Sequence, residues 1–156
     1  MKTLYVLSGI PGSGKSTWAR KFLSEHPDSS YIVSSDDIRK ELGGAYQYFE
    51  QEELVWKLFY ARLKDYAYNT RSVDVIADST CLENRFMIEA FTQTKNFDKY
   101  VLVYFDVDPK ISKERNKTRE SGKVVRDDVV DKMIKEFEKP NEVVQSIYDE
   151  IIVITE

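Results

Sequence analysis

The chain has 156 residues, of which 42% are hydrophobic and 32% charged, and its formal net charge is −4 at pH 7. This length suits one domain with a buried core, and the composition is typical of a globular protein rather than a disordered or fibrous one. The acidic balance excludes a strongly basic surface over the whole molecule, so contact with a polyanion would need a local basic patch.

Two features of the sequence bear on where the protein works. Cys81 is the single cysteine, so an internal disulfide and a cysteine-rich metal site are excluded, which fits a reducing compartment. The apolar run before Gly9 is too short for a signal peptide, and no stretch reaches the roughly 18 to 20 apolar residues of a membrane span. We therefore expect a cytoplasmic protein with no membrane partner.

Apolar runs typical of buried strands alternate with segments of helical period along the chain. Such alternation indicates an α/β fold, a parallel sheet flanked by helices on both faces. Since the sequence shows neither repeat nor linker, 1–156 is predicted to be a single domain. In the first half of the chain we expect strand 3–8, loop 9–14, helix 15–25, strand 31–34, a helix to about Leu42 capped by Ser35 or Asp36, and helix 51–69. Strand 73–77, helix 83–94 and strand 100–107 should follow, and then a helix from Pro109 to about Arg119 capped by Asp108. The last expected elements are a helix from Asp127 or Asp128 with Phe137 inward, a short helix after Pro140 and strand 151–154.

A glycine-rich loop lies between the first predicted strand and the first predicted helix. It has the pattern Gly-x4-Gly-Lys-Ser, in which glycines let backbone N–H groups turn inward around a polyphosphate and the helix N-terminus adds positive charge. Lys15 would contact the β- and γ-phosphates, the Ser16 hydroxyl can bind Mg²⁺, and Thr17 is placed to contact phosphate. We predict that ATP or GTP is bound by Gly9, Ile10, Pro11, Gly12, Ser13, Gly14, Lys15, Ser16 and Thr17.

The phosphate loop alone does not give the reaction, because switch GTPases and motor ATPases share it with kinases. A switch GTPase is expected to carry an Asn-Lys-x-Asp motif that reads guanine, and the sequence has none. The neighbours of Asp98-Lys99 and of Asn116-Lys117 do not complete it. A compact chain without a large insert therefore favours a small kinase.

Acidic residues follow the second and third predicted strands, at the sheet edge where the phosphate loop also lies. Asp36 can orient an acceptor hydroxyl and take its proton, and Arg39 lies one helical turn further on. The alternative is a helix cap with a surface ion pair. Asp78 could help to hold Mg²⁺, or hold Arg39 or the acceptor, or cap the next helix; Asp106 and Asp108 compete for these roles.

The stretch over 110–126 is the one basic region of the sequence. Arg115 and Arg119 are four residues apart and are expected to share a helix face. Arginines on a mobile lid over the phosphates can neutralise charge in a transition state. The alternative is an ordinary solvated helix face. The aromatic residues between 46 and 68 are expected mostly in the core, although Tyr46, Tyr48 and Phe49 could stack a base.

Four segments resemble, in order and spacing, the 5′-kinase domain of bacteriophage polynucleotide kinase. They are Gly-Ile-Pro-Gly-Ser-Gly-Lys-Ser-Thr-Trp-Ala-Arg at 9–20, Ser-Asp-Asp-Ile-Arg at 35–39, Ala-Asp-Ser-Thr at 77–80 and Arg-Asn-Lys-Thr-Arg at 115–119. The resemblance implies a P-loop kinase fold with strand order 2-3-1-4-5. It also implies transfer of the γ-phosphate of a nucleoside triphosphate, with Mg²⁺, to the 5′-hydroxyl of DNA or RNA.

The same resemblance assigns roles to individual residues. Lys15 and Ser16 would bind phosphate and Mg²⁺, and Asp36 would be the general base. Arg39 would bind the acceptor's 3′-phosphate and Asp78 would support Arg39 and the acceptor site. Arg115 and Arg119 would be the lid arginines, with Arg119 at the donor phosphates.

The sequence departs from that family at three places. Ser35 stands where the family commonly has Arg, and Asp106-Val107-Asp108-Pro109-Lys110 lacks the Thr of a phosphatase motif. The region over about 43–72 matches poorly, and it is the part expected to shape the acceptor channel. Two other readings therefore stay open, a kinase for a nucleoside, nucleotide, sugar or antibiotic hydroxyl, and a nucleotide-binding module without turnover. The acceptor, the choice of DNA or RNA and of ATP or GTP, and the oligomeric state are left undetermined.

Overall fold

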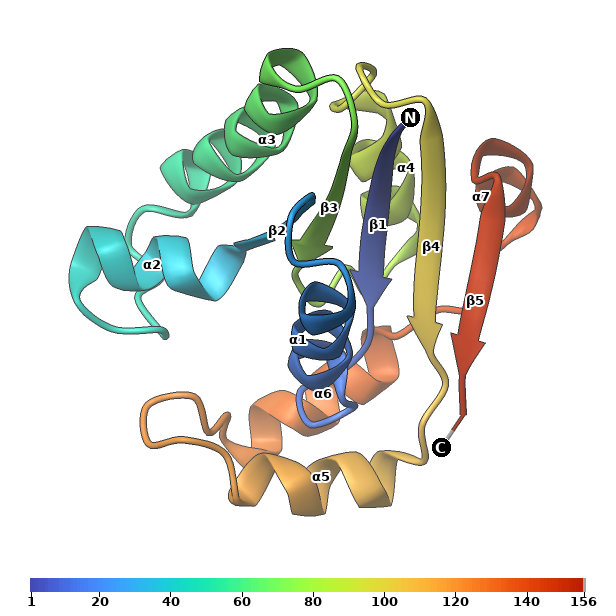
Figure 1. Ribbon diagram of the computed structural model, residues 1–156. Helices are drawn as coiled ribbons and strands as arrows, with labels where there is room; N and C mark the ends of the chain where they lie inside the picture. The colour runs from blue at the N-terminus through green and yellow to red at the C-terminus, as the bar shows by residue number, and fades with distance from the viewer. Residues whose placement is uncertain (156) are drawn as a thin grey trace.

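The structure, a computed structural model, describes residues 1–155, which contain one five-stranded parallel sheet. The strand order is β2-β3-β1-β4-β5, so the predicted fold class and the expected order 2-3-1-4-5 are confirmed (Figure 1). The strands are β1 (Lys2–Ser8), β2 (Ser30–Ser34), β3 (Val73–Asp78), β4 (Lys99–Phe105) and β5 (Glu150–Ile154).

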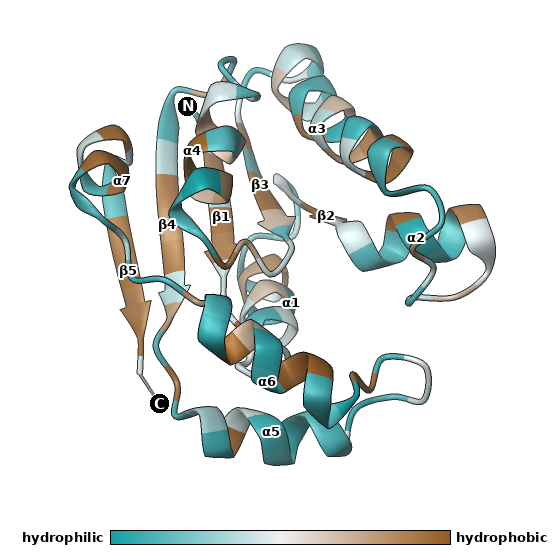
Figure 2. Cartoon of the chain, turned by 180° about the vertical axis from the view of Figure 1, so that it is seen from behind, coloured by the Kyte–Doolittle hydropathy of each residue, from teal (hydrophilic) through white to brown (hydrophobic). Residues whose placement is uncertain are grey.

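Helices cover both faces of the sheet, as parallel strands buried on both sides require. One layer is formed by α1, and the opposite layer by α3, α4 and α7 (Figures 1 and 2). The helices are α1 (Lys15–Glu25), α2 (Ser35–Gly43), α3 (Glu52–Asn69), α4 (Asn84–Thr92), α5 (Pro109–Lys117), α6 (Asp127–Glu136) and α7 (Glu142–Ile147).

The central strand β1 shows how the sequence builds the two layers. Successive side chains of a strand point to opposite faces. Leu4 and Val6 accordingly pack with α3, α4 and α7, while Leu7 packs with α1. Since both sets are apolar, the middle of the strand is mostly hydrophobic rather than alternating, as the brown colour over much of β1 shows in Figure 2.

The predicted cap of α2 is wrong by one or two residues. Ser34, the last residue of β2, caps the helix, because its extended backbone lets its hydroxyl accept a hydrogen bond from the Asp37 N–H at 3.3 Å. Ser35 and Asp36 are therefore helical residues of the first turn. This frees the Asp36 carboxylate from a capping role and leaves it beside the positive end of the helix.

The predicted end of α5 is also wrong, because the helix stops at Lys117 and not at Arg119. Thr118 ends it, with its N–H and its hydroxyl both donating to the Arg115 carbonyl. Smaller differences occur elsewhere: β4 ends at Phe105 instead of 107, α4 covers Asn84–Thr92, and α6 ends before Phe137, whose ring packs on Tyr104 instead. The predicted cap at Asp108 is confirmed by its hydrogen bond with the Lys110 N–H.

No helix of residues 1–155 has both the length and the hydropathy needed to cross a membrane.

Candidate active site

Three segments that carry predicted site residues meet at the carboxyl edge of the sheet. The phosphate loop joins β1 to α1, Asp78 ends β3, and α2 follows β2 directly. Because parallel strands end at the same edge, the three lie together there, as the doubly wound folds arrange their ligand sites. The structure thus brings together residues that are more than sixty positions apart in the sequence.

The phosphate loop has the backbone that anion binding requires. Gly12 and Gly14 have φ values of 82° and 99°, a region that favours glycine, and Gly14 is the N-cap of α1. The Lys15 ammonium donates to the carbonyls of Gly9 at 2.7 Å and Ile10 at 3.0 Å. Ile10, Pro11 and Ser13 are buried, whereas Thr17 is exposed in the first turn of α1.

Lys15 is in an unusual electrostatic setting. Burial lowers the pKa of its ammonium to about 8, and the nearby Arg119 charge also lowers it. The carboxylates of Asp78 and Asp36 act in the opposite direction and raise the pKa. Two carboxylates and a second cation are therefore close enough to affect this one group. An incoming phosphate would add the negative charge that keeps Lys15 protonated.

Asp78 and Ser16 form the predicted metal-binding end of the site. The Ser16 hydroxyl donates to Asp78 Oδ2 over a long hydrogen bond of 3.5 Å. Burial raises the pKa of Asp78, and the nearby Lys15 acts against this rise. A hydroxyl and a carboxylate side by side fit Mg²⁺, which prefers oxygen ligands and takes only one or two carboxylates when phosphates and waters complete its shell. Within the described residues no cluster of three or more His, Cys, Asp or Glu could hold a metal without such help.

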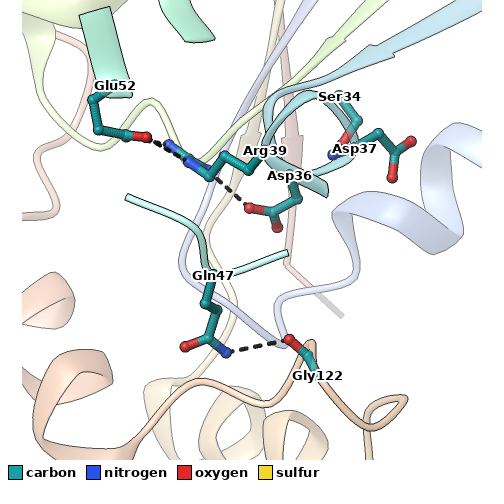
Figure 3. Close-up of polar contacts among 7 residues, drawn as sticks. All are labelled: Ser34, Asp36, Asp37, Arg39, Gln47, Glu52 and Gly122. Carbon is teal, nitrogen blue, oxygen red and sulfur yellow. Dashed lines mark hydrogen bonds and ion pairs between the residues drawn. The ribbon is translucent and has the colours of Figure 1, made fainter. Parts of the chain in front are cut away.

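Arg39 is held by carboxylates of two helices (Figure 3). Its Nη1 donates to Asp36 Oδ1 at 2.9 Å, while Nε and Nη2 donate to the two oxygens of Glu52 at 3.0 and 2.7 Å. The residue is only 8% exposed. The prediction that Asp78 supports Arg39 is therefore corrected: Glu52, at the start of α3, does so, and Asp78 is engaged by Ser16 instead.

Two aromatic rings also contact the Arg39 guanidinium. Its central carbon lies 5.2 Å from the centre of the Phe49 ring and 5.6 Å from that of Trp56. Both distances are in the range of cation–π interactions. Trp56 is half-buried against the core, but Phe49 is largely exposed on the connection between α2 and α3. Phe49, one of the three aromatic residues singled out as able to stack a base, therefore lies outside the core.

The lid segment consists of α5 and the loop over 118–126. Arg115 lies in the last turn of α5, whereas Arg119 follows the helix, so the two do not share a helix face as predicted. The Arg119 charge is still near Lys15 and Asp78, whose pKa values it lowers. The structure therefore places Arg119 near Lys15 and Asp78 by a turn rather than by helical spacing.

Asn116 fixes the shape of this lid loop. Its side chain is completely buried and makes two hydrogen bonds to Val125: its amide donates to the Val125 carbonyl at 2.6 Å, and its oxygen accepts from the Val125 N–H at 3.0 Å. The side-chain amide of Asn116 thus pairs with the backbone N–H and C=O of Val125, as the backbone of a neighbouring strand would. The loop between them is closed at its base, which accounts for the turn that carries Arg119.

The lid segment also contacts the phosphate loop and the segment that follows α2. A Cβ at Gly12 would lie 2.1 Å from the Ser112 carbonyl, so α5 packs directly on the phosphate loop. At the lid tip, the Gln47 side chain donates to the Gly122 carbonyl at 3.4 Å (Figure 3). It also donates to the Val124 carbonyl at 2.6 Å.

An aromatic contact accompanies this bridge. The ammonium groups of Lys40 and Lys123 lie 4.4 and 4.7 Å from the centre of the Tyr46 ring. Gln47 and Tyr46 together connect the segment after α2 to the lid.

Three of these residues were not found from the sequence. Glu52 belongs to the strongest helical segment, but nothing in its position indicates a partner thirteen residues earlier. Asn116 and Gln47 are polar residues in basic or aromatic surroundings, and their partners are backbone atoms that a sequence pattern does not mark.

A known family matches most of the chain. The model of the AAA domain family, AAA_33, matches residues 4–140. The chain belongs to this AAA domain family. The matched range of this AAA domain includes the phosphate loop, Asp36, Arg39, Asp78 and the whole lid segment.

A curated relative shares part of the AAA domain. Over 113 residues the chain is 34% identical to a Pongo abelii protein named 2′,3′-cyclic-nucleotide 3′-phosphodiesterase. The match covers 70% of this chain and 24% of that protein, so the chain spans about a quarter of the relative's length.

Solved structures share the fold of this AAA domain. A chain of the Pnkp1/Rnl/Hen1 RNA repair complex superposes with a TM-score of 0.75 at 22% identity, covering 95% of this chain and 46% of that one. A fungal RNA kinase gives 0.69 at 17% identity, with coverage of 99% and 39%. A gluconokinase from Sinorhizobium meliloti gives 0.60 at 16% identity, with coverage of 99% and 82%. At these identities the likeness shows a common P-loop kinase-like fold.

Proposed function

We propose that the protein transfers the γ-phosphate of a nucleoside triphosphate to the 5′-hydroxyl of a polynucleotide. The observation that carries the proposal is the Asp36 carboxylate, fixed by Arg39 at 2.9 Å in the first turn of α2 and close enough to influence Lys15. Phosphoryl transfer needs a base that takes the proton of the acceptor hydroxyl, and a carboxylate beside the phosphate-binding lysine is in the right place for this.

The reaction needs few covalent changes from the protein. The acceptor O–H bond breaks, its proton goes to Asp36, the oxygen bonds to the γ-phosphorus, and the bond between the γ-phosphorus and the β–γ bridging oxygen breaks. Lys15 and the loop N–H groups hold the donor phosphates, and Arg119 offsets charge on the transferred group. Ser16 and Asp78 would hold Mg²⁺, which neutralises phosphate charge when bound.

Several similarities support a nucleic-acid acceptor. The kinase-like fold is shared with the RNA kinase and with the RNA repair complex, and the curated relative is named for a nucleotide substrate. A phosphate on the acceptor would accept from the Arg39 N–H groups that Asp36 and Glu52 leave unused, since a guanidinium has five such donors and three of them are engaged. The second candidate is a small-molecule kinase, since the gluconokinase shares the fold and the chain has a net charge of −4.

The test is an acceptor panel with ATP labelled on the γ-phosphate. The panel contains 5′-hydroxyl DNA and RNA oligonucleotides, mononucleosides, a 3′-mononucleotide and sugars such as gluconate. Label on the oligonucleotides supports the proposal, and label on gluconate or a nucleoside alone supports the second candidate. ATP binding without label on any acceptor would instead indicate a nucleotide-binding module without turnover.

A further inference from the structure

Phe49 is a large apolar side chain that the fold leaves exposed next to the proposed base. The residue is 59% exposed and lies on the connection between α2 and α3. A single exposed aromatic residue is ordinary on a protein surface. This one differs because its ring lies against a buried and fully oriented arginine.

The arginine beneath the ring is held in one orientation. Three of its N–H groups donate to Asp36 and Glu52, and Trp56 contacts the same guanidinium. A bidentate pair fixes the plane of a guanidinium as well as its position. Phe49 therefore rests on an ordered surface, and its own ring orientation is restricted from that side.

The same guanidinium joins Phe49 to the chemistry. Arg39 contacts the Asp36 carboxylate at 2.9 Å and the Phe49 ring at 5.2 Å, so one nucleotide can reach from the carboxylate to the ring. Exposed aromatic rings beside cationic groups are how proteins bind the bases of single-stranded nucleic acid, since every base offers a π-face.

We propose that Phe49 is a stacking platform for the nucleobase at the 5′ end of the acceptor. The inference rests on the proposed function and gives it a substrate class, because a sugar or other non-aromatic acceptor has no face to stack. The hydroxyl would lie at Asp36, a phosphate of the acceptor near Arg39, and the base on the outer face of Phe49.

The first experiment measures binding without turnover. An oligonucleotide with 2-aminopurine as its 5′-terminal base is titrated with the protein in the absence of ATP, and stacking quenches the fluorescence. Phe49→Leu keeps an apolar side chain over Arg39 but lacks a π-face, and it should weaken binding roughly 5- to 100-fold, the range that loss of one base stack produces. Phe49→Trp should keep the quenching.

The matched control is Phe86→Leu. Phe86 is also an exposed phenylalanine next to an arginine, with the Arg85 guanidinium 4.5 Å from its ring, but it lies in α4. This variant should bind as the wild type does. Equal binding and equal quenching by wild type and Phe49→Leu would overturn the inference.

The second experiment separates stacking from a structural effect on Arg39. Wild type should prefer a 5′-terminal nucleotide with a base over an abasic one, and Phe49→Leu should lose that preference through a higher KM for the normal acceptor. An equal rise of KM for both acceptors would show that Phe49 only supports Arg39, and would overturn the inference. Absence of transfer to every oligonucleotide would overturn the proposed function instead, while the quenching experiment still decides the role of Phe49.

Discussion

The proposed donor and acceptor sides of the site are built in different ways. The phosphate loop takes its shape from its own backbone, with Gly12 and Gly14 at positive φ and Lys15 bonded to loop carbonyls. The acceptor side depends on side chains from two helices, where Glu52 and Asp36 hold Arg39 between them. A short contiguous motif can therefore specify the donor side, whereas the acceptor side requires the assembled fold.

The difference suggests which side can vary. A loop that binds phosphates through its backbone can serve the same phosphate donor, whichever acceptor is used. Contacts such as Glu52 with Arg39 can change residue by residue and leave the loop intact. The five following predictions test whether the two sides respond separately.

The largest effect is expected at Asp36. Asp36→Asn removes the group that takes the acceptor proton and should lower kcat by roughly 10² to 10⁴, the usual contribution of a general base. ATP affinity should stay within a few-fold, because the donor side is built from the phosphate loop. Steady-state kinetics with an oligonucleotide and equilibrium ATP titration measure the two quantities. Asp37→Asn, the exposed neighbour, is the control, and a large loss of ATP binding in Asp36→Asn would argue against separate sides.

The next effect is a loss of stability at Gly12. In Gly12→Ala the new Cβ would collide with the Ser112 carbonyl at 2.1 Å and the residue would be strained at φ 82°. We expect a loss of about 2 to 4 kcal/mol in the free energy of unfolding, from strain and overpacking together. Gly14→Ala shares the unfavourable φ but meets no atom within 4 Å, so it should lose less. Urea denaturation without nucleotide compares them, and equal losses would mean that α5 does not press on the loop.

The donor side should respond to pH through Lys15. Its pKa is lowered to about 8, so the ammonium loses its proton as the pH rises through that value in the nucleotide-free protein. ATP affinity should therefore fall above pH 8, approaching tenfold per pH unit, and ATP binding at pH 8.5 should take up a proton.

Calorimetry in two buffers of different ionisation enthalpy measures this uptake, and Lys15→Arg, which does not titrate there, should show none. The unfolded chain binds the Lys15 proton more tightly than the folded protein does. The free energy of unfolding of the nucleotide-free protein should therefore rise as the pH increases from about 8 toward 10.5. Proton release on ATP binding would contradict the assigned direction.

A smaller effect is expected at Glu52, which acts on the acceptor side alone. Glu52→Gln weakens the bidentate pair with the mostly buried Arg39, and we expect a loss of about 1 to 2 kcal/mol, below that of a fully buried pair because Glu52 is partly exposed. The KM of a 3′-phosphorylated acceptor should change while the KM of ATP does not. Glu53→Gln, the next and exposed residue of α3, is the control; an equal change in both KM values would break the division into two sides.

The smallest effect is expected where the two sides touch. Gln47→Ala removes two exposed hydrogen bonds to the lid backbone at Val124 and Gly122, worth about 0.5 to 1.5 kcal/mol together as a net contribution, because the Gly122 bond is long at 3.4 Å. The lid tip should then be cut faster by trypsin after Lys123. Gln145→Ala also removes a glutamine bond to a carbonyl, that of Pro140 in the remote α7 region, and should leave this rate unchanged. Equal cleavage of wild type and Gln47→Ala would show that the contact does not hold the lid.

The sequence predicted the phosphate loop well and the surroundings of Arg39 in part. The parallel sheet and the phosphate loop follow from local patterns, because apolar runs and glycine positions carry the information themselves. The strand order was expected from the family resemblance and not from such patterns. Glu52 could not be predicted, since its partner Arg39 is brought to it by the packing of α2 on α3. The end of α5 was missed because two contacts determine it: the hydrogen bond from the Thr118 hydroxyl to the Arg115 carbonyl, and the bond from Asn116 to Val125 that closes the loop. Helical periodicity indicates neither contact.

The most direct measurement follows the fate of the labelled γ-phosphate when the protein is mixed with ATP and a 5′-hydroxyl RNA or DNA oligonucleotide. Our account predicts label at the 5′ end with the wild type and with Asp37→Asn, and only a trace with Asp36→Asn. Label that appears solely as inorganic phosphate, or an Asp36→Asn variant as fast as the wild type, would contradict it.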